Sequence, residues 1–214
     1  MGDAIVNTYQ HSVLPVAVVD ADLEVRAQLV ALILAAGWQA RAFGSAEKLL
    51  EDPHAMTPGC FLLDIDLPGL SGLELQELLV KQVGTAVVFT SALQDIPLTV
   101  KAMRAGAVNF LPKPVNPEVL VSSIREALDR CRWRLSREAE ECVLRTRLFT
   151  LSQRERQVME LVVGGLMNKQ VATELGISEI TVKAHRGRVM RKMNARSLAA
   201  LVKMAGQLHT IGAH

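Results

Sequence analysis

The chain has few cysteines and few aromatic residues: three cysteines occur among 214 residues, and aromatic side chains make up only 4%. No two of Cys60, Cys131 and Cys142 have the Cys-x-x-Cys spacing of a zinc or redox site. Cys131 and Cys142 would lie roughly 16 Å apart along one helix, which is too far for a disulfide. We therefore expect reduced cysteines, as in a cytoplasmic protein.

Long hydrophobic runs are also absent, although half of the residues are hydrophobic. The longest apolar stretch, residues 29–38, is too short to span a bilayer. The N-terminus is polar and acidic, unlike the basic and then apolar start of a signal peptide. These absences predict a soluble, cytoplasmic, globular protein without a membrane partner, long enough for two small domains.

The small net charge of +2 hides an uneven distribution of charge along the chain. Residues 1–116 carry seven basic and twelve acidic residues, whereas residues 150–214 carry ten basic and four acidic ones. The segment between them, residues 117–149, is nearly balanced, with seven basic and six acidic residues. An anionic partner is therefore expected only at the C-terminal end.

Strand-like and helical segments alternate in the first half. Short β-rich runs occupy residues 16–19, 38–43, 60–63, 85–89 and 108–111. Helical patterns occupy residues 24–36, 45–51, 73–83 and 97–105. This alternation predicts an α/β fold, a doubly wound five-stranded parallel sheet with helices on both faces.

Chemically active side chains follow the strands of this predicted sheet. Asp20, Asp64, Thr90 and Lys113 stand at the carboxyl ends of strands, where function collects in such sheets. A carboxylate can attack phosphorus when a divalent cation neutralises the incoming oxygens, and Lys and Thr can hold the product. The set predicts a site that handles a phosphoryl group.

Four segments carry a family resemblance: VVDADLEVR, FLLDIDLPGLSG, VVFTSAL and RAGAVNFLPKPV. In this order they resemble the receiver domain of bacterial response regulators, a flavodoxin-like fold. The resemblance implies that Asp64 accepts a phosphoryl group from a cognate histidine kinase and that Thr90, Phe110 and Lys113 sense it. It also implies a cis peptide before Pro114 and a Mg²⁺ ion held by Asp20, Asp64 and Asp66. An ordinary core position for Phe110 is the alternative.

One position departs from the family pattern. Receivers usually have two adjacent acids after the first strand, and the second of them, a direct Mg²⁺ ligand, is replaced here by Ala21. Losing a carboxylate should weaken Mg²⁺ binding. The side chain of Asp66 could compensate, while Asp22 is expected to act as a solvated helix cap.

Residues 117–147 contain no glycine and no proline after Pro117, which predicts one long helix. An apolar stripe runs along it, formed by Ile124, Leu128, Cys131, Leu135 and Cys142. Such a stripe is typical of a short coiled coil between two chains or of a helix docked on a neighbour. A plain exposed linker remains the alternative.

The last third has the spacing of a helix-turn-helix, from Asn168 to Gly187. Small Ala172 allows two helices to cross closely, Gly176 supplies the turn, and Val182 anchors the second helix. LSQRERQV, GLMNKQVATELGIS and TVKAHRGRVMRKM resemble the LuxR-type DNA-binding domain, an all-α four-helix unit. Together the two parts resemble a response regulator of the NarL/FixJ type, over nearly all of residues 13–208.

DNA contacts are expected on and around the second helix of this motif. Lys183 and Ala184 lie in its first turns, which reach base edges, and Ala184 could touch a thymine methyl group. The arginines further along are better placed for phosphates. The full predicted set is Lys169, Thr181, Lys183, Ala184, His185, Arg186, Gly187, Arg188, Arg191 and Lys192.

Together these features predict a transcription regulator rather than an enzyme, with a DNA site of two half-sites and a homodimer once activated. The expected organisation is a tail at 1–12, a receiver at 13–128, a helical linker at 129–149 and a DNA-binding domain at 150–214. A DNA-binding dimer that needs no phosphorylation is the main alternative. A phosphatase of the haloacid-dehalogenase type is remote, because that family places its Asp-x-Asp after the first strand, whereas Asp64 and Asp66 follow the third.

Overall fold

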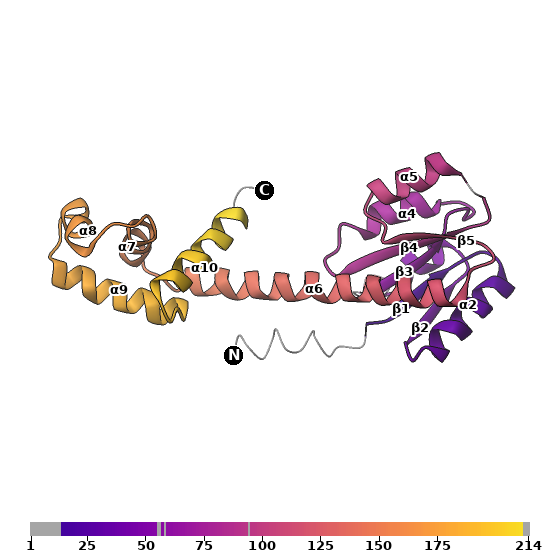
Figure 1. Ribbon diagram of the computed structural model, residues 1–214, viewed down its shortest axis with the longest axis horizontal. Helices are drawn as coiled ribbons and strands as arrows, with labels where there is room; N and C mark the ends of the chain where they lie inside the picture. Colours follow the sequence, from indigo (N-terminus) through magenta and orange to yellow (C-terminus); the bar gives the residue numbers. More distant parts are fainter. Residues whose placement is uncertain (1–13, 55–56, 58, 94, 212–214) are drawn as a thin grey trace. The chain divides into compact units, whose positions relative to one another are not determined.

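The computed structural model describes residues 14–54, 57, 59–93 and 95–211 of the chain (Figure 1). These residues form two compact units, and the division between them falls inside one helix, between Arg137 and Glu138. The predicted tail at 1–12 lies outside the described residues. No helix among the described residues is long and apolar enough to cross a membrane.

A parallel sheet of five strands forms the centre of the first unit, with the strand order β2-β1-β3-β4-β5. The strands are β1 (Val16–Val19), β2 (Ala40–Phe43), β3 (Gly59–Asp64), β4 (Thr85–Ser91) and β5 (Asn109–Pro112). Each neighbouring pair is parallel. The three central strands are buried along their whole length, as their continuous apolar runs require. The predicted doubly wound α/β fold is confirmed.

Alternate strand residues point to opposite sides of this sheet. Both sides are apolar, and helices cover both of them. Val16 and Val18 face a core completed by α2 (Leu23–Ala35) and by the first part of α6 (Pro117–Phe149). Ala17 and Val19 face the other core. That core is completed by α3 (Ala46–Leu50), α4 (Gly72–Leu79) and α5 (Ile96–Arg104). The predicted helices therefore exist, with ends shifted by a few residues.

The long helix α6 packs on the sheet as far as Leu135. Arg134 donates a hydrogen bond to the carbonyl of Thr85 at 3.2 Å. Gly84 has a φ of +79°, and a Cβ there would lie 2.5 Å from a methyl carbon of Leu135. Glycine is therefore required at this position both by the backbone conformation and by the closeness of the helix.

The second unit consists of the end of α6 and four further helices. They are α7 (Gln153–Val163), α8 (Asn168–Leu175), α9 (Glu179–Met193) and α10 (Leu198–Ile211). Ser152 and Glu155 form a capping box at the start of α7, and Ser178 caps α9. Gly176 adopts the left-handed conformation at the end of α8, with a φ of 62°. The predicted helix-turn-helix is thus built by the local signals that suggested it.

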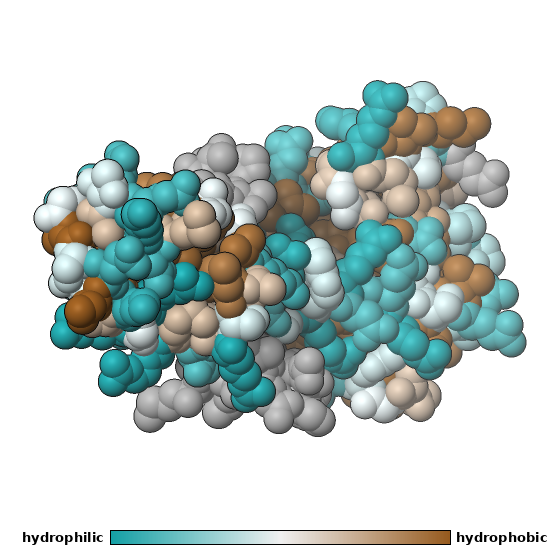
Figure 2. All heavy atoms as spheres, turned by 60° about the vertical axis from the view of Figure 1, so that its left-hand side comes forward, coloured by the Kyte–Doolittle hydropathy of each residue, from teal (hydrophilic) through white to brown (hydrophobic). Residues whose placement is uncertain are grey.

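Hydrophobic side chains at the surface occur mostly in separate patches, as is usual for a folded chain. Figure 2 shows one face, on which hydrophilic residues alternate with small hydrophobic areas. A stripe of larger side chains lies on α5, where Ile96 is 76% exposed and Val100 and Met103 are also exposed. Their spacing of four and three residues places them on one side of the helix.

Candidate functional site

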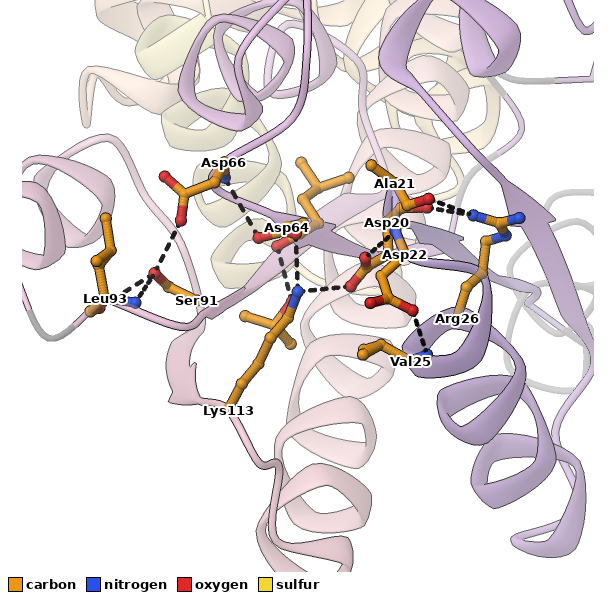
Figure 3. Close-up of polar contacts among 12 residues, drawn as sticks. Asp20, Ala21, Asp22, Val25, Arg26, Asp64, Asp66, Ser91, Leu93 and Lys113 are labelled. Atoms are coloured by element: carbon orange, nitrogen blue, oxygen red, sulfur yellow. Dashed lines mark hydrogen bonds and ion pairs between the residues drawn. The ribbon is translucent and has the colours of Figure 1, made fainter.

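Three charged side chains meet at the carboxyl edge of the sheet (Figure 3). Asp20 follows β1, Asp64 ends β3, and Lys113 follows β5. The ammonium nitrogen of Lys113 lies 2.7 Å from Oδ2 of Asp20 and 2.7 Å from Oδ2 of Asp64. The parallel strands β1, β3, β4 and β5 bring these residues together from positions far apart in the sequence, as the strand-end pattern predicted.

Burial makes these charges depend on one another. The Asp20 side chain is fully buried and that of Asp64 is 10% exposed. Burial by itself lowers the pKa of Lys113, but the contacts with Asp20 and Asp64 outweigh this effect and raise the pKa above its ordinary value. Two carboxylates and one ammonium leave a net charge of −1, which favours a further cation at this edge.

Asp64 has the geometry of an acceptor for an incoming electrophile. Its Oδ1 accepts a hydrogen bond from the backbone N–H of Asp66 at 3.2 Å, and its Oδ2 accepts one from Lys113. Both contacts hold the carboxylate in one orientation. The peptide bond between Lys113 and Pro114 is cis, as the family resemblance implied.

The two residues expected to sense phosphorylation lie next to this carboxylate along the sheet. Thr90 is paired with Asp64 in the strand register, and its hydroxyl points back toward the carbonyl of Leu63 at 3.5 Å. Phe110 is half-buried, with its ring centroid 6.3 Å from that of Phe89. Phe110 packs against the core on the same face as α5.

The structure does not bring the predicted metal ligands together as a set of three. Asp66 is exposed, and its Oδ2 lies 3.5 Å from the hydroxyl of Ser91 rather than beside Asp20. No group of three or more His, Cys, Asp or Glu side chains in the described part of the chain could hold a metal ion. The side chains at this edge that suit Mg²⁺ are those of Asp20 and Asp64, because carboxylate oxygens are its preferred ligands.

Neither Ala21 nor Asp22 supplies a further carboxylate ligand at this edge. Asp22 is exposed and caps α2, accepting hydrogen bonds from the N–H groups of Glu24 at 2.8 Å and Val25 at 3.1 Å. These bonds lower the pKa of Asp22. The carboxylate of Asp22 is therefore engaged as the expected helix cap, and Ala21 offers no ligand in its place.

Two residues that stabilise the loops at this edge were not predicted from the sequence. Arg26 donates hydrogen bonds to the carbonyl of Asp20 at 2.5 Å and to that of Ala21 at 3.3 Å. Glu47 on α3 accepts a hydrogen bond from the N–H of Leu70 at 3.0 Å, which lowers the pKa of Glu47. Both contacts fix loops next to the site. Arg26 stands inside the matched segment VVDADLEVR, which was the available signal.

The helix α9 presents a mixed surface. Val182, Val189 and Met193 are buried against the rest of the second unit, while Lys183, Ala184 and Gly187 are exposed. The turn before α9 is closed by Gly176 and by half-buried Ile177. An exposed face of small and cationic residues on a firmly anchored helix suits a DNA major groove.

Only some of the predicted DNA-binding residues have free side chains. Arg186 donates to Oδ1 of Asn168 at 3.0 Å, and the hydroxyls of Thr181 and Ser178 lie 2.8 Å apart. His185 is half-buried. Within the described residues, four predicted cations have no hydrogen bond or ion pair from their side chains: Lys169, Lys183, Arg188 and Arg191.

Lys192, which was predicted to bind DNA, also has partners within the second unit. Its ammonium lies 2.7 Å from Oε2 of Glu155 and donates to the carbonyl of Thr150 at 2.9 Å. Glu155 is 3% exposed and belongs to the capping box of α7. The hydrogen bond from Lys192, followed by that from the N–H of Ser152, lowers the pKa of Glu155 to about 2. Sequence gave no sign of this contact, because the partners are far apart along the chain.

The predicted stripe on α6 is divided between two environments. Ile124, Leu128, Cys131 and Leu135 are buried in the core of the first unit, so a second chain cannot reach them. Cys142 is exposed and is not part of this buried stripe. The first four residues dock the helix on its own chain, which was one of the two roles that the pattern left open.

Comparison with known proteins agrees with this geometry. Residues 16–125 match the family described as response regulator receiver domain, and residues 149–205 match bacterial regulatory proteins of the luxR family. Nodulation protein W of Bradyrhizobium diazoefficiens is 46% identical over 194 residues, covering 89% of this chain and 85% of that protein. The transcriptional regulatory protein FixJ of Azorhizobium caulinodans is 40% identical over 193 residues, covering 90% and 92%.

Solved structures show the same likeness. The response regulator StyR matches with a TM-score of 0.80 at 43% identity, covering 92% of this chain and all of that chain. Full-length FixJ from B. japonicum matches with a TM-score of 0.55 at 35% identity, covering 92% and 97%.

Proposed function

The chain belongs to the response regulators that join a receiver domain to a LuxR-type DNA-binding domain, and we propose that phosphorylation of Asp64 controls its sequence-specific binding to DNA. The family consists of two-component transcription regulators, which receive phosphoryl groups from histidine kinases and bind DNA. The chain is therefore a regulator rather than an enzyme, and the phosphatase alternative is not retained.

The contact of Lys113 with both Asp20 and Asp64 carries this proposal. A carboxylate oxygen of Asp64 attacks the phosphorus of a phosphohistidine, the P–N bond breaks, and the imidazole leaves, its ring nitrogen taking a proton from solvent. The Lys113 ammonium then holds a phosphoryl oxygen in place of a carboxylate oxygen. Hydrolysis of this aspartyl phosphate by water is the one enzymatic step that we assign to the chain.

In this proposal, Thr90 and Phe110 transmit the phosphorylation of Asp64 to the rest of the receiver. The Thr90 hydroxyl points toward the carbonyl of Leu63 in this structure, so it must rotate before it can donate to a phosphoryl oxygen. The space it leaves allows the half-buried ring of Phe110 to move inward. Phe110 packs on the same core as α5, and a change there reaches the exposed stripe of Ile96, Val100 and Met103.

We place the contact of an activated homodimer on this stripe. The stripe lies on α5, whose inner side packs on the same core as Phe110, and burying it against a second copy would remove hydrophobic area from water. Two chains would then present two copies of α9, which suits DNA with two half-sites. The buried stripe of α6 is unavailable for this role.

The functional domains keep the expected bounds in this proposal: a receiver at 13–128, a linker at 129–149 and a DNA-binding domain at 150–214. The first residues of the linker stabilise the receiver, since Cys131 and Leu135 are packed in its core.

Receiver domains generally bind Mg²⁺, and we propose that this one binds it weakly. Asp20 and Asp64 would hold the ion, and the backbone carbonyl of Asp66 would be a third ligand. When bound, the ion supplies positive charge to the oxygens of the incoming phosphoryl group. We expect weak Mg²⁺ binding because Ala21 stands where receivers usually have a carboxylate that binds the ion directly.

Ala21 also favours a second candidate, a DNA-binding dimer that needs no phosphorylation. One experiment separates the two candidates. The full chain is treated with a small phosphodonor and Mg²⁺, intact mass is recorded, and affinity for a preferred duplex is measured before and after. Asp64→Asn is the control, because it keeps the shape of the side chain and removes the nucleophile.

We expect one added phosphoryl group on the wild type, none on Asp64→Asn, and tighter DNA binding only for the phosphorylated chain. Unchanged mass at saturating Mg²⁺, together with sequence-specific binding, would support DNA binding without phosphorylation instead.

A further inference from the structure

Ile180 is the most exposed of the large hydrophobic side chains that the structure describes, with 80% of its surface accessible. It is the second residue of α9. Residues four, seven and eleven positions later, Ala184, Gly187 and Arg191, lie on the same face of the helix. Val182, which is fully buried, marks the opposite face.

The centre line of this outward face lacks polar side chains over its first two turns. It runs from the aliphatic side chain of Ile180 through the methyl group of Ala184 to the bare backbone of Gly187. The two exposed cations Lys183 and Arg188 flank this line on its two sides. The arrangement places apolar surface in the middle and positive charge at the edges.

The packing of the second unit does not explain this composition. A Cβ at Gly187 would meet no described atom within 4 Å, although glycine in a helix is less stable than alanine. Isoleucine is likewise a weaker helix former than alanine, and the Ile180 side chain is mostly exposed. Gly187 and Ile180 therefore fit a role in contact with another molecule that lies close to α9.

The charges show what that surface is. Residues 150–214 carry ten basic and four acidic residues, and Lys183 and Arg188 border the apolar line. DNA supplies phosphates for such cations, and within its major groove the apolar group on a base edge is the thymine C5 methyl.

We propose that Ile180 is a specificity-determining residue that packs on the C5 methyl group of one thymine in each half-site. The inference rests on the proposed DNA binding through α9 and adds a base preference to it. Ile180 selects T·A over the other pairs at one position, because only thymine presents this methyl group in unmodified DNA.

The test removes the methyl group from the DNA and the side chain from the protein. A preferred duplex is first selected from a random pool with the full-length wild type. Each thymine of one half-site is then replaced singly by deoxyuridine, which lacks only the methyl group. Affinities are measured for the wild type, for Ile180→Ala, and for the control Val202→Ala, which shortens an exposed side chain on α10.

One replacement should weaken wild-type binding about fourfold, the effect of about 0.8 kcal/mol for one buried methyl group. Val202→Ala should show the same loss. Ile180→Ala should bind the thymine duplex several-fold more weakly and should not distinguish it from the uracil duplex. Since Ile180 is mostly exposed, its replacement should leave thermal stability almost unchanged.

An equal loss for Ile180→Ala and the wild type at every thymine would overturn the inference. So would a loss that disappears in Ala184→Gly but persists in Ile180→Ala, because the contact would then belong to Ala184. Failure of the proposed function looks different: the wild type itself would show no preference for any duplex.

Discussion

In the receiver, Lys113 lies 2.7 Å from two carboxylates, whereas on α9 the side chain of Lys183 is exposed and pairs with no described residue. The receiver site is buried, and each of its charges is held by the others. The proposed DNA-binding surface on α9 is open, and its free charges are available to a partner.

This difference decides what a charged residue means in each region. In the buried site, a change at one residue alters the environment of the others, as the raised pKa of Lys113 shows. On α9 the cations divide into those that hold the unit together, Lys192 and Arg186, and those that remain free. The basic residues of α9 are therefore not equally available to DNA.

The largest expected effect is on the stability of the receiver, and it compares a buried and an exposed residue of α6. Leu128 is 1% exposed in the receiver core, while Trp133 on the same helix is 63% exposed. Leu128→Glu should destabilise the receiver by more than about 4 kcal/mol, since it buries a charge without a partner. Trp133→Glu should cost about 1 kcal/mol or less, mainly by removing the contact with Arg137. Denaturant unfolding followed by circular dichroism measures both. A folded Leu128→Glu with altered oligomeric state would instead place the stripe between chains.

A smaller effect is expected for the engaged cation of the second unit. Lys192→Met should destabilise that unit by about 1–2 kcal/mol, because the buried Glu155 carboxylate loses its charged donor. Lys183→Met is the matched control and should leave stability unchanged, since its side chain is exposed. Thermal unfolding of the full chain measures both variants.

The same pair predicts a pH dependence. The folded state lowers the pKa of Glu155 from 4.5 to about 2. The resulting stability is present above about pH 4.5 and is lost as the pH falls toward 2. Lys192→Met should lose this acid-sensitive part of the stability. An identical pH profile for both proteins would show that the ion pair does not form in solution.

Most of the fold follows from local patterns in the sequence. The buried runs of β1, β3 and β4, the caps Asp22, Ser152 and Ser178, and the turn glycine Gly176 each act within a few residues. Parallel topology then brings Asp20, Asp64 and Lys113 to one edge, so the site could also be predicted.

Contacts between distant residues were beyond such patterns. Lys192 and Glu155 are 37 residues apart, and Glu47 reaches the N–H of Leu70 over 23 residues. The apolar period on α6 indicated that one side is buried but not by what, because the core of its own chain and a partner helix demand the same pattern. The position of the Asp66 side chain likewise depends on Ser91, in a different strand.

Among the free cations, position along α9 should separate base reading from phosphate binding. Lys183→Ala should cost roughly 1–3 kcal/mol on the preferred duplex and relax the preference at one base pair. Arg188→Ala should weaken all sequences alike and reduce the salt dependence by about one unit. Lys192→Met should leave that dependence unchanged, since its ammonium is paired with Glu155.

Binding isotherms on preferred and scrambled duplexes across a salt series measure these effects. If Lys183→Ala kept the ratio between the two duplexes, α9 would enter the groove in another orientation. A full unit of lost salt dependence in Lys192→Met would return this residue to the DNA surface.

The smallest expected effect is on Mg²⁺ binding, when a carboxylate is placed at position 21 as in the usual receiver pattern. Ala21→Asp adds a carboxylate beside Asp20 and should tighten Mg²⁺ binding by about tenfold, because the ion gains a direct oxygen ligand. Ala21→Asn is the matched control: it has nearly the same size, is uncharged, and should tighten binding less. Titration calorimetry measures the affinities, and intact mass after a fixed time with a phosphodonor should show faster modification of Ala21→Asp. Equal affinities for the wild type and Ala21→Asp would mean that Asp66 leaves Ser91 and already completes the site, so that the substitution at residue 21 does not limit phosphorylation.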